Sequence, residues 1–269
     1  MANLETRSRN SWVSGGLWDM TGHARVTTFI GAGGKTTCLR TMTREIDATG
    51  LRVIATTTTK VFPEQSMKEW KSPNPPPQEL DGTCFWYVDV LEGSGKWLGP
   101  PVQAVDAAIG RASVSDLYWV IEGDGARGLH LKCWEPHEPQ IPQRSDCVVL
   151  VLDGGLWGRV LKAEQVHRPA GCQELLGHVW DAEKAWGYFL RSPVFAPQYG
   201  QMSWVILMNC HEENAENENS VEPLVLLQDL GHRWAEIQAE VKDLKYRPSH
   251  LRFAAGNAKE GKLQWFDLW

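Results

Sequence analysis

A glycine-rich loop followed by a lysine and two threonines is the segment whose residue types could most directly perform chemistry. Glycines let the backbone curl so that its N–H groups point at phosphate oxygens, and a helix starting behind them adds partial positive charge. The lysine of such a loop contacts the β and γ phosphates, and the first threonine hydroxyl binds Mg²⁺. The loop therefore predicts a site for ATP or another nucleoside triphosphate, with Mg²⁺. Its residues are Gly31, Ala32, Gly33, Gly34, Lys35, Thr36 and Thr37.

The spacing of this loop differs from that of the commonest phosphate loop. The pattern GxxxxGK[ST] would require a glycine at position 29, where this chain has Phe29. The shorter form G-x-x-G-K-T-T resembles the phosphate loops of ATP-dependent Mur-type ligases. A structural glycine turn beside an exposed lysine is the alternative, but the loop stands between an expected strand and an expected helix, which favours a phosphate site.

Two carboxylates, Glu122 and Asp124, follow an apolar run at residues 117–121. They stand at alternate positions, so both side chains can point to one face at the end of a strand. Phosphoryl transfer needs an acidic group that holds Mg²⁺. We expect Asp124 to hold the metal together with Thr36, and Glu122 to orient a water or a substrate hydroxyl. With Lys35 they form the expected catalytic set, and the alternative is a solvated strand end.

Further polar residues stand where they could meet a substrate. Thr58, Thr59 and Lys60 follow a β-rich run at residues 51–57, so the hydroxyls could reach phosphate and Lys60 an anionic substrate group. Arg127 could stabilise charge on a transferred phosphoryl group. A threonine run that merely favours β-structure and a surface arginine are the alternatives.

Metal-ligand spacing and cysteine usage are weaker signals. His130, Cys133 and His137 could supply metal ligands, although structural or solvent-exposed roles fit three loop residues better. The six cysteines include no CxxC pair, which predicts reduced thiols and a cytoplasmic location.

The segment after an apolar run at residues 204–208 bears on the choice of base. It reads Asn209-Cys210-His211-Glu212, where a guanine-reading GTPase would show N-K-x-D. This difference favours ATP over GTP.

Strand-like and helix-like segments alternate along the chain. This alternation predicts an α/β fold with a doubly wound, mostly parallel sheet, similar to P-loop NTPases. We expect residues 1–24 to form an N-terminal extension and residues 25–269 a single nucleotide-binding domain. Loops are expected at residues 72–77, 93–99 and 211–220. The expected strands are residues 25–30, 51–57, 85–90, 117–121, 148–152, 204–208 and 251–255, and the expected helices are residues 36–49, 102–112 and 224–242.

Composition excludes several classes of protein. A net charge of -6 and a pI near 5.8 argue against nucleic acid as the main partner, because phosphate neutralisation needs clustered lysine and arginine. No apolar run is long enough to span a bilayer, and the N-terminus lacks the apolar core of a secretory signal. We therefore expect neither a nucleic-acid nor a membrane partner.

Five ordered sequence blocks resemble the YqeC family, whose members are described as selenium-dependent hydroxylase accessory or selenium cofactor biosynthesis proteins. The resemblance implies a P-loop nucleotide-binding protein that helps to mature selenium-dependent molybdenum hydroxylases, with the hydroxylase or its molybdopterin cofactor intermediate as partner. It also places His137, Glu138, His167 and Arg168, which match family motifs, near the substrate. Gly123 and Cys133 depart from the family pattern, where alanine and a small apolar residue are expected. The blocks are VTTFIGAGGKTT (26–37), RVIATTTTKVFP (52–63), IEGDGARGLHLK (121–132), EPHEPQIP (135–142) and VHRP (166–169).

Three functional hypotheses follow from these observations. The first is a nucleoside-triphosphate-hydrolysing accessory enzyme acting on a selenium or molybdopterin intermediate. The second, prompted by the Mur-like loop, is a ligase or kinase working through a phosphorylated intermediate. The third is a non-catalytic, nucleotide-gated chaperone that docks a hydroxylase.

Overall fold

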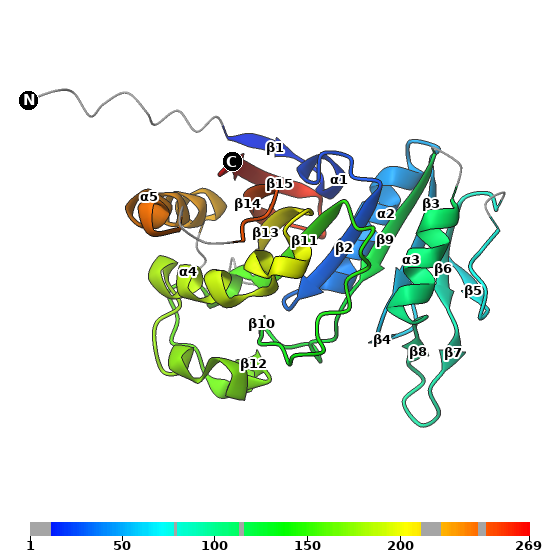
Figure 1. Ribbon diagram of the computed structural model, residues 1–269, viewed down its shortest axis with the longest axis horizontal. Coiled ribbons are helices and arrows are strands. Elements are labelled where there is room, and N and C mark those ends of the chain that lie inside the picture. The colour runs from blue at the N-terminus through cyan, green and yellow to red at the C-terminus, as the bar shows by residue number, and fades with distance from the viewer. Residues whose placement is uncertain (1–11, 78–79, 113–115, 211–221, 242–245) are drawn as a thin grey trace, which may run out of the picture.

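The structure of the protein is a computed structural model that describes residues 12–77, 80–112, 116–210, 222–241 and 246–269. One ten-stranded sheet forms its centre, in the order β1-β15-β14-β13-β11-β2-β9-β3-β6-β5 (Figure 1). Neighbouring strands are parallel from β14 to β5, whereas β15 is antiparallel to both β14 and β1. The strands are β1 (Val13–Gly15), β2 (Val26–Gly31), β3 (Arg52–Thr57), β5 (Lys68–Lys71), β6 (Thr83–Tyr87), β9 (Leu117–Glu122), β11 (Cys147–Asp153), β13 (Ser203–Asn209), β14 (His250–Asn257) and β15 (Lys262–Asp267).

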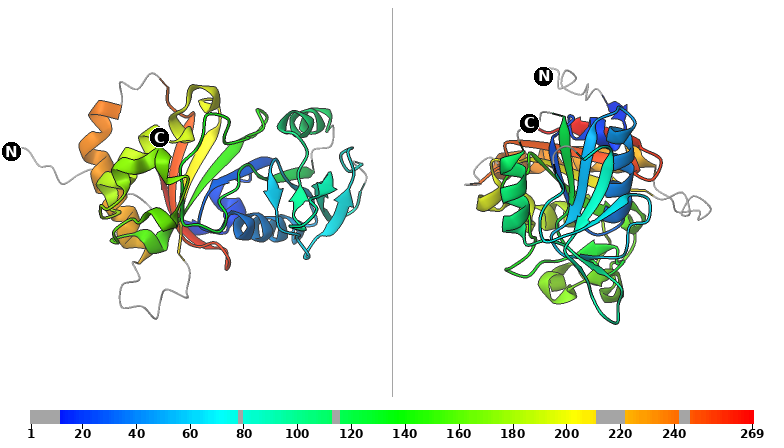
Figure 2. Two further views of the ribbon diagram at one scale, coloured as in Figure 1. Left: turned by 90° about the horizontal axis from the view of Figure 1, so that it is seen from below. Right: turned by 90° about the vertical axis from the view of Figure 1, so that its right-hand side faces the viewer.

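Helices cover both faces of this sheet. Figure 2 shows α2 and α3 on opposite faces, with the strands between them. Alternate residues of β11 follow the same division: Val149 packs in the cluster that contains α1 and α2, and Leu150 packs in the cluster that contains α4 and α5. The fold is therefore α/β with a large, mostly parallel sheet, as the sequence predicted. The helices are α1 (Leu17–Met20), α2 (Lys35–Asp47), α3 (Val102–Arg111), α4 (Ala182–Arg191) and α5 (Pro223–Val241).

The order of the strands changes direction at β2. After β2 the chain builds β3 and β6 on one side and returns to β9, and it then builds β11, β13 and β14 on the other side. Ligands of open α/β sheets bind beyond the carboxyl ends of the strands at such a point. Gly31, Glu122 and Asp153 are the last residues of the three adjacent strands β2, β9 and β11.

Two small sheets lie apart from the main one. The strand β8 pairs antiparallel with both β4 and β7, and β10 pairs in parallel with β12. Both small sheets belong to segments that follow carboxyl ends of the main strands. Their strands are β4 (Lys60–Val61), β7 (Asp89–Val90), β8 (Trp97–Leu98), β10 (Leu131–Lys132) and β12 (Val166–His167). Short 3-10 helices are η1 (Gly154–Leu156), η2 (Ala163–Gln165), η3 (Pro169–Leu175), η4 (Pro193–Phe195) and η5 (Pro197–Tyr199).

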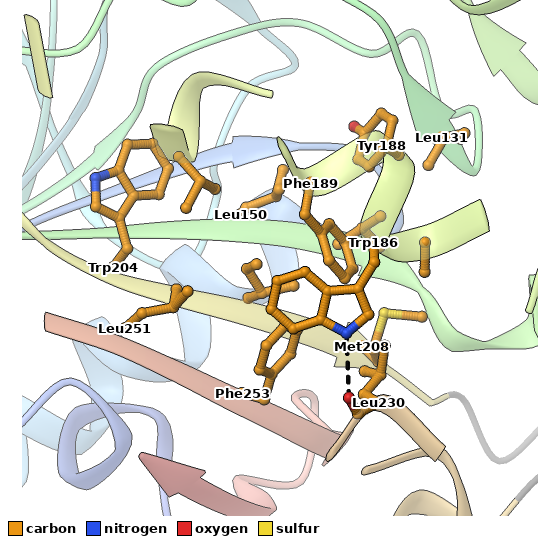
Figure 3. Packing of buried hydrophobic residues seen from close by; sticks show 14 of the residues in the cluster. Leu131, Leu150, Trp186, Tyr188, Phe189, Trp204, Met208, Leu230, Leu251 and Phe253 are labelled. Carbon is orange, nitrogen blue, oxygen red and sulfur yellow. Dashed lines mark hydrogen bonds between the residues drawn. The ribbon is translucent and has the colours of Figure 1, made fainter. Parts of the chain in front are cut away.

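Aromatic side chains fill the space between the sheet and α4 and α5. Trp186 packs edge-on against Phe253, with ring centroids 5.2 Å apart, and its indole N–H donates to the carbonyl of Leu230 over 3.1 Å (Figure 3). Phe189 lies against the same Phe253 ring. Burial of these rings fixes α4 on the sheet, and the tryptophan N–H is satisfied by α5.

Several elements differ from the sequence expectation. The strand β15 follows the segment 251–255 that was expected to be last, and the expected turn 93–99 contains β8. Both strands pair with partners across a short connection, which single-strand apolar patterns do not reveal. The segment 72–77 is a loop as expected, whereas the expected loop 211–220 lies outside the described residues.

One pair of cysteines also departs from expectation. Cys133 and Cys172 are joined in a disulfide with Cα atoms 6.2 Å apart, so the prediction that all thiols are reduced is wrong for this pair. Their separation of 39 residues gives no hint that β10 and η3 lie together.

Within the described residues, no helix is long and apolar enough to cross a membrane.

Residues of the expected N-terminal extension take part in the fold. The strand β1 pairs with β15, and α1 packs on α2 with Leu17 and Met20 fully buried. A Glu45 carboxylate of α2 accepts hydrogen bonds from the amides of Leu17 and Trp18, over 3.1 and 2.7 Å.

Substituting Leu17 tests whether this segment supports the domain. We expect Leu17→Ala to lower the free energy of unfolding by about 2–5 kcal/mol, because it opens a cavity between α1 and α2. Val13→Ala is the matched control, since Val13 is 47% exposed on β1, and should change stability by less than about 0.5 kcal/mol. Urea unfolding measures both, and equal effects of the two substitutions would show that α1 is dispensable.

Candidate functional site

The glycine-rich loop connects β2 to α2 in a conformation that requires glycine. Gly31, Gly33 and Gly34 have φ values of 95°, 86° and 119°, in the left-handed region. A Cβ on Gly33 would lie 2.4 Å from the amide nitrogen of Asp153, and one on Gly31 would lie 2.4 Å from the carbonyl oxygen of Val151. The loop is thus pressed against the end of β11, with no room for side chains at these two positions.

The amides of the loop fall into two groups. The amide of Gly31 donates to the Asp124 carboxylate over 3.0 Å, and that of Ala32 donates to the Val151 carbonyl over 2.9 Å. Among the described residues, none accepts a hydrogen bond from the amides of residues 33–37, which include the first turn of α2. Of the loop that the sequence analysis expected to offer its amides to phosphate, the amides of Gly31 and Ala32 are thus already paired, and those of residues 33–37 remain open to a ligand.

Asn209, at the carboxyl end of β13, holds the loop from the other side. Its side-chain amide donates to the carbonyl of Gly33 over 2.8 Å, and its side-chain oxygen accepts from the amide of Ala258 over 3.0 Å. The side chain is fully buried. This residue, which the sequence analysis compared with a base-reading motif, supports the glycine-rich loop, while His211 and Glu212 of the same segment lie outside the described residues.

Lys35, Thr36 and Glu122 form a buried group beside the loop. The Lys35 ammonium donates to the Gly31 carbonyl over 2.6 Å and lies 3.8 Å from Glu122 Oε1. The Thr36 hydroxyl donates to Glu122 Oε2 over 2.8 Å. Burial raises the pKa of Glu122 above its ordinary value, although the Lys35 charge opposes this shift.

Asp124 occupies a different environment from Glu122. Its carboxylate is fully buried and accepts from the amide of Gly31 and, over 2.8 Å, from the indole N–H of Trp134. Lys35 lies 3.3 Å from Oδ1 and Lys132 lies 3.6 Å from Oδ2. The carboxylate that meets the Thr36 hydroxyl is thus Glu122 and not Asp124, and the assignment of Asp124 to a metal stays a prediction.

Lys132 is a central residue that the sequence analysis did not assign to the site. Its side chain is fully buried, and its ammonium donates to the Gly125 carbonyl over 2.6 Å and to Glu138 Oε1 over 3.1 Å. The hydroxyl of Tyr188 donates to the Lys132 carbonyl over 2.6 Å. The alternation of Lys132 with Leu129 and Leu131 would ordinarily predict an exposed lysine, so the sequence carried no signal for this burial.

A cavity of about 750 Å³ lies beyond the carboxyl ends of the strands and collects most of the candidate residues. Thr59, Lys60, Arg127, Glu138, His167 and Arg168, which the sequence analysis assigned to a substrate, all line it. So do Glu122 and the loop residues that carry unpaired amides. Its lining is Gly33, Gly34, Lys35, Thr36, Thr37, Thr59, Lys60, Val61, Phe62, Lys96, Glu122, Gly125, Ala126, Arg127, Gly128, Leu129, His130, Glu138, Asp153, His167 and Arg168.

Several candidate residues do not line this cavity: Gly31, Ala32 and Asp124, whose contacts are given above, and Thr58 and His137. The Thr58 hydroxyl donates to the Gln140 carbonyl over 2.7 Å and so holds two loops together. The His137 side chain is 66% exposed, with its imidazole Nδ1 3.5 Å from Glu135 Oε2. The structure therefore separates His137 from Glu138, which lines the cavity, and the expectation that His137 lies near a substrate stays a prediction.

Another part of the cavity lining, which we call the far wall, consists of Glu138, His167 at the end of β12, and Arg168. Arg168 pairs with Glu135 and, over 3.0 Å, with Glu138, so its guanidinium is held near Lys132. Burial, and next the Lys132 charge, lower the pKa of His167 below its ordinary value. The His167 imidazole is therefore neutral at neutral pH.

The structure does not assemble a metal site from His130, Cys133 and His137. Cys133 is in the disulfide with Cys172, and His130 Nδ1 pairs with Asp153 instead. Across the part of the chain that the structure describes, no group of three or more potential ligands of this kind is found.

Asp153 is a third carboxylate at the cavity that the sequence analysis missed. It ends β11 as Glu122 ends β9, and one of its oxygens accepts from the amide of Gly155 over 2.8 Å. The same sequence signal, an acidic residue directly after an apolar run, marks both positions. The side-chain oxygens near the start of α2 that could bind a metal ion come from Thr36, Glu122 and Asp153.

Comparison with known proteins assigns this chain to a family. The family model described as YqeC protein matches residues 27–170, which include the loop, both carboxylates of β9 and its extension, and the far wall. A protein of Escherichia coli (strain K12), named uncharacterized protein YqeC, is 34% identical over 164 residues, covering 58% of this chain and 62% of that relative. The match thus spans less than two thirds of the relative's length. No solved structure matches significantly. This chain belongs to the YqeC family.

Proposed function

We propose that this protein binds a nucleoside triphosphate with Mg²⁺ and hydrolyses it during the maturation of selenium-dependent molybdenum hydroxylases. The proposal that the protein binds a nucleotide rests on one observation, the cavity at the point where the strand order changes direction. It joins the glycine loop, Glu122 and the basic residues of β12 and its surroundings, although these segments are far apart in the sequence.

The polyphosphate would lie at the start of α2. The unpaired amides of residues 33–37 and the positive end of the helix are suited to phosphate oxygens. Lys35 has its ammonium held by the Gly31 carbonyl at the base of the loop, so a phosphate would compete with Glu122 and Asp124 for its charge.

The donors beside Lys35 fit Mg²⁺. This ion prefers oxygen ligands and accepts one or two carboxylates together with phosphate oxygens. The Thr36 hydroxyl and the Glu122 carboxylate are in contact, and Asp153 lines the same cavity. We assign Thr36 and Glu122 to the metal, which would neutralise charge developing on the phosphates when bound.

Arg127 and Arg168 supply positive charge across the cavity from the loop. Arg127 is exposed in a turn with a φ of 54°, and it can reach a bound phosphate or a second substrate. Arg168 is held by Glu138 and Glu135. This wall suits an anionic acceptor. Its assignment to a hydroxylase or its molybdopterin cofactor intermediate rests on the YqeC resemblance.

A ligase or kinase reaction is the second candidate. It is favoured by the extent of the cavity, which continues past the loop to His167 and Arg168 and has a volume of about 750 Å³. A phosphorylated or ligated product formed from a molybdopterin intermediate would support this reaction, and release of phosphate alone would support hydrolysis. Nucleotide binding without turnover, with stable co-purification of a hydroxylase, would instead indicate a nucleotide-gated chaperone.

Substituting Lys35 tests the phosphate site. We expect Lys35→Met to weaken ATP binding by roughly 10- to 100-fold, because a charge-assisted contact to phosphate is lost. Titration calorimetry with Mg²⁺ measures this loss. Lys71→Met is the matched control, since Lys71 is half-exposed on the edge strand β5, and it should bind ATP like the wild type. Equal affinity of the two variants would contradict the phosphate site.

A pair of isosteric substitutions separates the roles of the two carboxylates. We expect Glu122→Gln to keep the fold and to abolish the gain in ATP affinity that Mg²⁺ provides. Asp124→Asn should instead lower the free energy of unfolding by about 3–5 kcal/mol, because Lys132 and Lys35 lose a buried counter-charge. Urea unfolding and calorimetry with and without Mg²⁺ measure the two effects. The reverse pattern would restore Asp124 as the metal ligand.

A further inference from the structure

Phe62 is an exposed aromatic residue at the cavity that contains the phosphate loop. It is 66% exposed, the highest value among the large hydrophobic residues that the structure describes as exposed. It follows β4 directly and lines the cavity together with Lys35 and Thr36. An apolar ring in the wall of a polar, charged cavity has no role in phosphate or metal binding.

The backbone on both sides of Phe62 is anchored. Val61 is buried and pairs in β4 with Trp97, whose ring stacks on Tyr87 with centroids 4.1 Å apart. On the other side Glu64 is 2% exposed and accepts from Arg40 of α2 over 2.7 and 2.9 Å.

These anchors tie the ring to the phosphate loop. Hydrogen bonds from Arg40 and Ser66 hold the pKa of Glu64 below its ordinary value, although burial opposes them, so the ion pair is charged at neutral pH. Arg40 stands in the helix that begins at Lys35. The position of Phe62 relative to the unpaired amides is therefore set by the fold.

Lys96 adds a charge beside this ring. Its ammonium lies 4.4 Å from the centroid of Phe62, at cation–π distance, and Lys96 lines the same cavity. The ammonium occupies one side of the ring, and much of the remaining ring surface is exposed. A flat, electron-rich ligand ring next to Phe62 would meet both the aromatic surface and a nearby cation.

We propose that Phe62 is the platform on which the base of the bound nucleotide stacks. The inference rests on the proposed function, since it names the base subsite of the same cavity. Stacking on an aromatic ring is available to every base, because every base has a π-face. Adenine and guanine nucleotides should therefore both bind, with affinity for the base provided by Phe62 and affinity for the phosphates provided by the loop.

A comparison of three ligands tests the base subsite and the phosphate subsite independently. Titration calorimetry with Mg²⁺ would compare ATP, GTP and inorganic tripolyphosphate, which has the phosphates but no base. We expect Phe62→Ala to weaken ATP and GTP by a similar factor of about 5 to 100, and to change tripolyphosphate affinity by less than about twofold. Phe62→Trp should retain ATP affinity because it keeps an aromatic surface.

Val90→Ala is the matched control. Val90 is 38% exposed on β7 of the same three-stranded sheet but does not line the cavity, so its loss should leave all three affinities unchanged. The inference is overturned if Phe62→Ala binds ATP like the wild type, or loses tripolyphosphate as strongly as ATP. If the wild type binds none of the three ligands, the proposed function fails together with the inference. If the wild type binds them and only the Phe62→Ala result disagrees, the inference fails alone.

Discussion

The buried carboxylate of Asp124 is the interaction on which the site depends. It accepts hydrogen bonds from the amide of Gly31, at the start of the glycine-rich loop, and from the indole N–H of Trp134, and it lies within 3.6 Å of the ammonium groups of Lys35 and Lys132. A buried carboxylate is stable only when such partners satisfy it. Two segments that are distant in the sequence, residues 31–35 and 132–134, are thereby held around the Asp124 carboxylate, and a shift of the loop would remove two of its four partners.

The same network extends from the loop to the opposite wall of the cavity. The Lys132 ammonium also pairs with the carboxylate of Glu138, which in turn pairs with Arg168. The charges that hold the loop therefore also hold β10 and β12. Low exposure of Lys132 strengthens these contacts, because few waters compete for the ammonium. The charged groups near the loop and those near β12 are in this way parts of a single electrostatic network.

The sequence predicted the strand, loop and helix around Lys35, because apolar runs and glycines report local structure directly. It placed Glu122 and Asp124 on one face and assigned Asp124 to the metal, but it could not show that Trp134 and Lys132 surround Asp124 whereas Glu122 meets the Thr36 hydroxyl. Similarly, His137 was grouped with Glu138, and only the turn of the backbone separates them. Contacts between segments distant in the sequence decide these assignments, and no local pattern carries them.

The hydrogen bond from Asn209 to the carbonyl of Gly33 links the glycine-rich loop to a part of the chain that the family model does not match. Asn209 stands on β13, beyond the segment 27–170 that the family shares, and its other contact is to Ala258 near the end of the chain. A fragment that stopped at residue 170 would lose this brace and uncover one edge of β11. The segment that matches the family contains the loop and Glu122, whereas a residue from the C-terminal part of the chain holds that loop in place.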